Sequence, residues 1–239
     1  MYEPSILVFA SRVGFGVESL VDSDPDRQPM QGKVMPIGEA MGTLHPTDAH
    51  YVAYLTYEGE RLDEKQYRIN KSALPQIQAR NGDTRTSVFS LDIDNIGHAA
   101  WTQSGIEDFE QRFARLPANL RPHWMYRSRN GARFVYHLLT PISSETGEKF
   151  LRGLIKVLAE HGFRADELAD WNRSFRLPMV MRDGKASTED FSFTLEHYPD
   201  SPLLDAASLP AIESGTTKRQ RGDLTGIPDP SLDPMPTPE

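Results

Sequence analysis

Short apolar stretches separated by polar turns run through this 239-residue chain, and most of them predict β-strands. The stretches ILVFA at residues 6–10 and YVAYLTY at residues 51–57 have the β-branched and aromatic content that is typical of strands. By the same criteria, further strands are predicted over residues 67–71, 87–95, 124–127, 132–139 and 190–197, with a short ordered segment around residues 175–180.

Two stretches have helical rather than strand spacing. The first is predicted to begin at the N-cap Ser104, with Glu107 completing a capping box, and to end before Pro117. The second is predicted to begin after Ser143 or Ser144 and to end at residue 162, a glycine suited to a helix C-terminus. The apolar faces comprise Ile106, Phe109, Phe113 and Leu116 in the first helix, and Phe150, Leu151, Leu154, Ile155 and Leu158 in the second.

The order of these elements predicts the fold. Asn130-Gly131 is a strong hairpin signal between two strands. The order after residue 86 is therefore strand, helix, strand, strand, helix, strand, which is typical of the ferredoxin-like or RRM-like split βαβ fold of the α+β class. We expect a four-stranded sheet with two helices on one face, spanning about residues 86–198.

The two ends of the chain have weaker patterns. Residues 1–85 predict an α/β extension of the same domain, in which residues 14–42 are mostly loop. The domain is expected to end near residue 200. From residue 201 the periodicity is lost, and residues 223–239 contain five prolines, so we expect residues 201–239 to be a disordered tail.

Composition excludes several classes of chemistry. The chain has no cysteine, which rules out disulfides, thiolate zinc sites and cysteine nucleophiles. No apolar run approaches the roughly eighteen residues that a membrane span needs. The start, MYEP, lacks the basic and then apolar order of a secretory signal. We expect a cytoplasmic protein without a membrane partner.

The charge is unevenly distributed. The net charge is −8, but residues 111–182 carry thirteen Lys or Arg and six Asp or Glu, which gives +7 there and −15 elsewhere. A basic middle in an acidic chain indicates either a phosphate-binding surface or a solvated helix face.

The strand at residues 87–95 ends in two carboxylates, Asp92 and Asp94. Side chains alternate along a strand, so these two point to the same face. Neighbouring carboxylates repel each other unless a cation lies between them, and oxygen ligands suit Mg²⁺ or Mn²⁺. The alternative is a strand that runs into an ordinary Asp/Asn turn.

A second charged group follows at residues 170–178. Asp170 is a third carboxylate, and Arg173 and Arg176 lie three residues apart, so both can face one site. Arginine binds phosphate oxygens in pairs, which would suit a triphosphate. The alternative is a group of surface ion pairs.

The predicted hairpin offers a third group. Its turn, from Ser128 to Gly131, combines a hydroxyl with backbone N–H groups, an arrangement that can hold an anion. Arg133 and His137 follow on the second strand and share a face because an even number of residues separates them. The alternative is a hairpin whose charged residues are simply solvated.

These three groups, in this order, resemble the motifs of the archaeo-eukaryotic primase superfamily, the primase-polymerases of plasmids, phages and mobile elements. Residues 91–94 (LDID) look like the first motif, residues 128–133 (SRNGAR) lie where the second would fall, and residues 170–178 (DWNRSFRLP) are similar to the third, with Lys185 as the lysine that often follows. The chain departs from the family at Arg133, which stands where many members have a histidine; the nearest histidine is His137.

The resemblance implies a nucleotidyltransferase that makes or extends primers on a single-stranded DNA template from NTPs or dNTPs. It implies that Asp92, Asp94 and Asp170 hold two Mg²⁺ or Mn²⁺ ions, and that a replicative helicase or initiator is a partner. The triphosphate ligands would be Ser128, Arg133, His137, Arg173 and Arg176. The template would contact Lys71, Lys185 and the aromatic residues Trp124, Tyr126 and Trp171, which we expect to be exposed.

Two other functions use the same residues. A non-catalytic nucleic-acid-binding or replication-initiator protein could retain this fold, and the departure at Arg133 favours it. A metal-dependent nuclease or phosphatase needs the same carboxylates.

Overall fold

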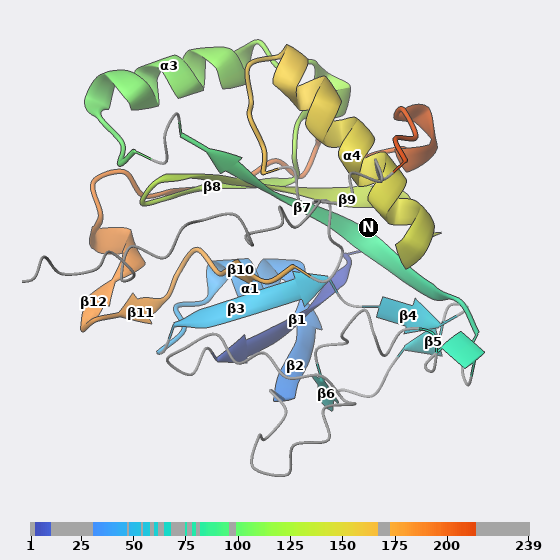
Figure 1. The fold of residues 1–239 in the computed structure, drawn as a ribbon. Helices are drawn as coiled ribbons and strands as arrows, with labels where there is room; N and C mark the ends of the chain where they lie inside the picture. The colour runs from blue at the N-terminus through green and yellow to red at the C-terminus, as the bar shows by residue number, and fades with distance from the viewer. Residues whose placement is uncertain are drawn as a thin grey trace, which may run out of the picture.

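The chain forms three layers: two helices, a six-stranded sheet beneath them, and a five-stranded sheet beneath the six-stranded one (Figure 1). The structure is a computed structural model. It describes residues 3–10, 31–46, 48–53, 55–57, 60–61, 65–67, 75, 78–79, 82–95, 99–166 and 173–213.

The six-stranded sheet, here called the central sheet, has the order β13-β8-β9-β7-β4-β5. All of its neighbouring strands are antiparallel. Its strands are β4 (Leu55–Tyr57), β5 (Glu60–Arg61), β7 (Thr84–Asp94), β8 (Trp124–Ser128), β9 (Gly131–Ser143) and β13 (Thr194–His197).

The five-stranded sheet, here called the lower sheet, has the order β10-β3-β1-β2-β6 and is also antiparallel. Its strands are β1 (Ser5–Ala10), β2 (Gln31–Pro36), β3 (Ala49–Ala53), β6 (Lys65–Tyr67) and β10 (Phe175–Arg176). The remaining elements are α1 (Ile37–Gly42), α3 (Gln103–Ala114), α4 (Ser144–Glu160), the hairpin strands β11 (Met181–Arg182) and β12 (Lys185–Ala186), and 3₁₀ turns at Ala118–Leu120, Ser187–Glu189 and Ala206–Ser208.

The expected α+β class is confirmed, and so is the Asn-Gly hairpin between β8 and β9. The expected strand order is only half present. β7, α3 and β8 form a split βαβ unit with β9 between the two strands, and α3 and α4 cover one face (Figure 1). In the ferredoxin-like order the fourth strand would lie beside β7. Instead, β13 pairs with β8, and β4 pairs with β7.

Two predictions about the N-terminal half are wrong. Residues 31–42, expected to be loop, form β2 and α1. Pairing with β1 orders this stretch, and Met35 and Ile37 are buried. Residues 51–57, expected to be one strand, contribute to two: β3 pairs with β1 in the lower sheet, whereas β4 pairs with β7 in the central sheet.

The two helices are present, but the start of the first differs from the prediction. Thr102, not Ser104, is the N-cap of α3: its hydroxyl accepts a hydrogen bond from the Gly105 N–H at 3.1 Å. Glu107 instead accepts a hydrogen bond from Gln103, so the predicted capping box is absent. Helix α4 begins at Ser144 as expected, and Gly162 follows its end with a φ of +82°, a conformation that favours glycine.

Strand β7 contributes to both cores because its side chains alternate. Phe89, Leu91 and Ile93 pack beneath the helices, together with Phe109 of α3 and Leu154 of α4. On the other face, the core between the two sheets contains Val88, Tyr51, Trp124, Tyr126, Val135 and Phe175.

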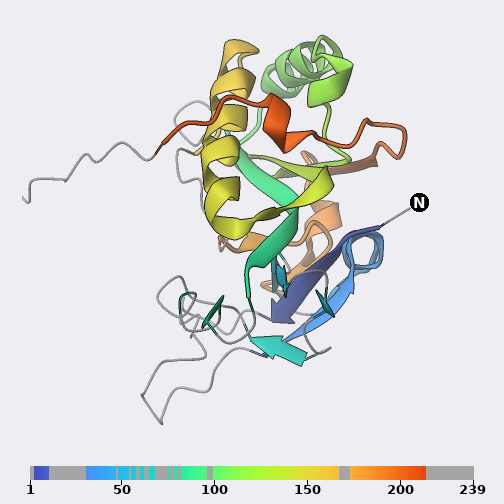
Figure 2. The ribbon, with the colours of Figure 1, turned by 90° about the vertical axis from the view of Figure 1, so that its right-hand side faces the viewer.

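The ordered chain extends beyond the predicted boundary at residue 201. Leu204 and Leu209 are buried in the core beneath the helices. The Leu204 N–H donates to the His137 carbonyl at 2.8 Å, and the segment passes along α4 (Figure 2). Residues 214–239, which carry the rest of the predicted tail, lie outside the described residues. In the part of the chain that is described, no helix is long and apolar enough to cross a membrane.

The contact of residues 201–213 with α4 yields a stability prediction. A Cβ on Gly153 would lie 1.9 Å from the Pro210 carbonyl oxygen, so Gly153→Ala must displace backbone. We expect a loss of about 1–3 kcal/mol in the free energy of unfolding, measured by urea denaturation. Gly42→Ala is the control, because nothing lies within 4 Å of a Cβ there. Equal stability of the Gly153→Ala variant and the wild type would contradict the observed packing.

Candidate active site

The carboxylates at the end of β7 are positioned by its pairing with β9. The register places Asp92 opposite Arg133 and Asp94 opposite Gly131. Leu91 and Ile93 point towards the helices, so Asp92 and Asp94 lie on the face towards the lower sheet. The strands approach so closely here that a Cβ on Gly131 would lie 2.3 Å from the Ile93 carbonyl oxygen. Glycine is therefore required at this turn.

Asp92 is held between two arginines, and its side chain is only 14% exposed. Arg133 Nη1 donates to Oδ1 of Asp92, and Arg173 Nη2 donates to Oδ2 at 3.4 Å. Arg173 also reaches a further carboxylate, with Nη1 at 2.8 Å from Asp166 Oδ2. We call Asp92, Asp94, Asp166, Arg133 and Arg173 the charged cluster.

Asp166 is a member of this cluster that the sequence analysis missed. Residue 165 forms a bridge with Ile93, and the Asp166 N–H donates to the Asp92 carbonyl at 3.1 Å. This contact joins positions more than seventy residues apart, and the sequence around Asp166 has no motif that signals it. A third carboxylate therefore lies beside Asp92 among the described residues.

Burial raises the pKa of the Asp92 carboxyl. The guanidinium groups of Arg133 and Arg173 oppose this effect, whereas the negative charges of Asp94 and Asp166 add to it. Ionised Asp92 therefore depends on cations close to it. In this structure two arginines supply that positive charge.

Aromatic side chains of the lower sheet lie against the two arginines of the cluster. The guanidinium carbons of Arg133 and Arg173 lie 5.9 and 5.6 Å from the centre of the buried Phe175 ring. Phe175 in turn contacts Tyr51, with 5.8 Å between ring centres. One ring therefore contacts both arginines.

The other predicted triphosphate ligands have different surroundings. Arg176 forms two hydrogen bonds with Asp48, at 2.6 and 3.2 Å, and none to Asp92. The Ser128 hydroxyl donates to the Gly131 carbonyl at 3.1 Å and so closes the hairpin. His137 is buried and stacks on His123 with 4.2 Å between ring centres. It lies four residues along β9 from Arg133, about 13 Å away.

The predicted template residues divide into two groups. Trp124 and Tyr126 are 8% and 2% exposed, so the expectation that they form an exposed stacking surface is wrong. They are buried because the lower sheet covers this face of the central sheet. Lys185 is exposed on β12. Lys71, Trp171 and the predicted metal ligand Asp170 lie outside the described residues.

A cleft of about 460 Å³ opens beside Asp94, between the end of β7 and the start of α3. Its walls are mostly apolar, and the exposed side chain of Arg164 lies at its edge. The lining residues include Asp94, Trp101, Gly105, Phe109, Arg112 and Arg164.

The comparisons with known proteins give little further information. No protein-family model matches the chain, and no curated protein matches it. Among solved structures, the AEP domain of the cyanophage S-2L primase-polymerase (PrimPol) is similar, with 11% identity and a TM-score of 0.42 over 86% of this chain and 85% of that one.

The stacked histidines yield a prediction about pH. Burial lowers the pKa of His123 to about 4 and that of His137 to about 3, from an ordinary value of 6.5. The nearby His197 adds to the lowering in both, as does His123 for His137. Between about pH 6.5 and pH 4 the unfolded chain therefore binds more protons than the folded one. The free energy of unfolding should fall on acidification by up to about 1.4 kcal/mol per pH unit for each histidine.

This slope can be measured by urea denaturation at several pH values. His137→Leu should reduce it. Nε2 of His137 has no hydrogen-bond partner among the described residues, so the substitution breaks no hydrogen bond at that atom. A His137→Leu variant with the wild-type slope would show that this histidine does not titrate as expected.

Proposed function

We propose that this protein is a metal-dependent nucleotidyltransferase of the primase-polymerase type, which makes or extends a strand on a single-stranded DNA template. The observation that carries the proposal is the charged cluster itself. Partly buried carboxylates and two guanidinium groups, supplied by three separate segments, meet between the two sheets. Nucleotidyl transfer needs both kinds of group at one place, to hold cations and to bind a triphosphate.

The two arginines are suited to bind the triphosphate of an incoming nucleotide. Both guanidinium groups rest on Phe175, so they are positioned before a ligand arrives. Nε of Arg133 is buried and lacks a hydrogen-bond partner among the described residues. A phosphate oxygen would satisfy this donor. Arg176 binds Asp48 instead and is not part of the proposed triphosphate site.

The carboxylates fit Mg²⁺ or Mn²⁺ by the chemistry of their donors. Asp92, Asp94 and Asp166 offer hard oxygen ligands, although no three acidic or histidine side chains of the described residues stand close enough to hold an ion as they are. Asp170 is the third ligand that the family resemblance implies. When bound, two such ions would lower the pKa of the attacking 3′-hydroxyl and neutralise the departing pyrophosphate.

The cleft beside Asp94 offers a path for the strand. It shares Asp94 with the charged cluster, while its other walls, Trp101 and Phe109 among them, lie on the helix side of β7. A strand in the cleft would therefore pass the end of β7 to reach the carboxylates. Its apolar walls suit a base or sugar, and Arg164 suits a phosphate. This path replaces the stacking surface that Trp124 and Tyr126 cannot form. A helicase or initiator is the partner class we propose.

One observation favours the non-catalytic alternative. Both carboxylate oxygens of Asp92 are engaged by arginines, as in a purely structural ion pair. A binding protein of this kind would retain its affinity for single-stranded DNA in EDTA and make no new strand.

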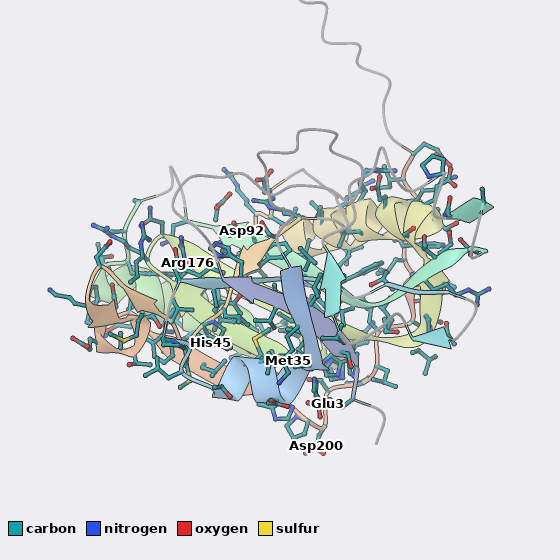
Figure 3. All side chains as sticks on the ribbon, turned by 90° about the horizontal axis from the view of Figure 1, so that it is seen from below. Glu3, Met35, His45, Asp92, Arg176 and Asp200 are labelled. Atoms are coloured by element: carbon teal, nitrogen blue, oxygen red, sulfur yellow. The ribbon has the colours of Figure 1, made fainter. Side chains whose placement is uncertain are left out.

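Asp92→Asn tests the catalytic proposal. With template, Mn²⁺ or Mg²⁺ and labelled ribo- or deoxynucleotides, we expect the variant to lose at least about a hundredfold in incorporation, because a group that stabilises charge in the transition state is lost. Asp200→Asn is the matched control: this exposed residue lies at the far margin of the molecule from Asp92 (Figure 3). Wild-type incorporation by Asp92→Asn would contradict the proposal. Release of nucleotides without added triphosphate would indicate a nuclease.

Arg164→Ala tests the proposed path of the strand. If Arg164 neutralises one phosphate, the slope of log affinity for single-stranded DNA against log salt should become shallower by about 0.7. Fluorescence anisotropy with a labelled oligonucleotide measures this slope. Arg182→Ala, on the β11–β12 hairpin, is the control and should retain it. Unchanged slopes in both variants would place the strand elsewhere.

A further inference from the structure

The Arg133–Asp92 ion pair occupies groups that the proposed function needs for two different ligands. A divalent cation would require the carboxylate of Asp92, and a triphosphate would require the guanidinium of Arg133. In this structure each group binds the other. Arg173 does the same between Asp92 and Asp166. Arg133 and Arg173 therefore occupy the position beside the Asp92 carboxylate that a divalent cation would take.

The geometry makes this pair more than an incidental surface contact. The two residues lie directly opposite each other in the register of β7 and β9, and their side chains are 14% and 16% exposed. Phe175 supports the guanidinium from one side. Yet Arg133 still has an unused donor at Nε. That nitrogen is buried, so an anion reaches Arg133 by taking the place of the Asp92 carboxylate at the guanidinium.

We infer that Arg133 couples the two ligands, so that a polyphosphate that engages Arg133 releases Asp92 and thereby strengthens the binding of a divalent cation at the charged cluster. Without the anion, a cation must compete with two guanidinium groups for Asp92. Coupling of this kind is reciprocal: the cation must strengthen anion binding by the same factor. The identity of the anion as a nucleoside triphosphate rests on the proposed function.

The coupling can be tested one ligand at a time, which avoids chelation of the cation by phosphate in solution. Mn²⁺ binding to the full chain, without any phosphate, is followed by the electron paramagnetic resonance signal of free Mn²⁺. Arg133→Gln should bind Mn²⁺ about tenfold more tightly than the wild type, within the usual range for coupled sites. Arg176→Gln removes the same charge from Asp48 instead and should change the affinity less than twofold.

The second arm uses inorganic tripolyphosphate in EDTA, measured by calorimetry. Asp92→Asn releases Arg133 and should bind tripolyphosphate several-fold more tightly than the wild type, whereas Arg133→Gln should bind it several-fold more weakly. If Arg133→Gln does not fold, Arg133→Lys is used in its place. Lysine is a compact charge rather than a planar donor, so a smaller gain in Mn²⁺ affinity is expected.

The outcomes separate this inference from the proposed function. Wild-type Mn²⁺ affinity in a folded Arg133→Gln variant, or an equal gain in Arg176→Gln, would overturn the coupling. A lower melting temperature without a change in either affinity would mark the ion pair as structural only. If the affinities shift as expected but the wild type makes no strand, the coupling stands and the proposed function fails.

Discussion

The antiparallel pairing of β7 with β9 determines where every other part of the site lies. Its register sets Asp92 against Arg133, and the close approach at Gly131 fixes the end of the pair. A shift by one residue would turn Asp92 into the core beneath the helices and Leu91 towards the lower sheet. The same alternation that buries the core thus sorts the charges, so fold and site depend on one set of backbone hydrogen bonds.

Burying the charged groups of the cluster costs desolvation free energy, and their arrangement indicates a reason other than stability for their presence. A buried ion pair contributes little net stability, since desolvation offsets the attraction between its partners. Asp92 nevertheless lies beside two further carboxylates and two arginines, and Phe175 of the lower sheet supports these arginines. Apolar side chains of similar volume at these positions would stabilise the fold equally well. A site that exchanges these internal pairs for a cation and a polyphosphate accounts for the arrangement.

Local signals predicted the central elements well, and tertiary contacts decided the rest. The Asn-Gly turn and the helical spacing identified the hairpin, α3 and α4 because each signal is complete within a few residues. Residues 31–42 have no periodic pattern and become ordered only through β1, while Leu204 is ordered by packing against β9 and α4. At the site, the sequence predicted the two carboxylates at the end of β7. The position of Asp166 could not be predicted in the same way, because it depends on a long-range bridge to β7. The burial of Trp124 follows from the lower sheet, which no local pattern reveals.

The proposed function requires that a divalent cation binds at the charged cluster between the sheets. Cleavage of the backbone by hydroxyl radicals from Fe²⁺, bound in place of Mg²⁺ with tripolyphosphate present, locates such an ion directly. We expect cuts near residues 92–94, 131–133, 164–166 and 173, abolished by excess Mg²⁺. Cuts confined to other segments, or the same weak pattern in Asp92→Asn and wild-type protein, would contradict it.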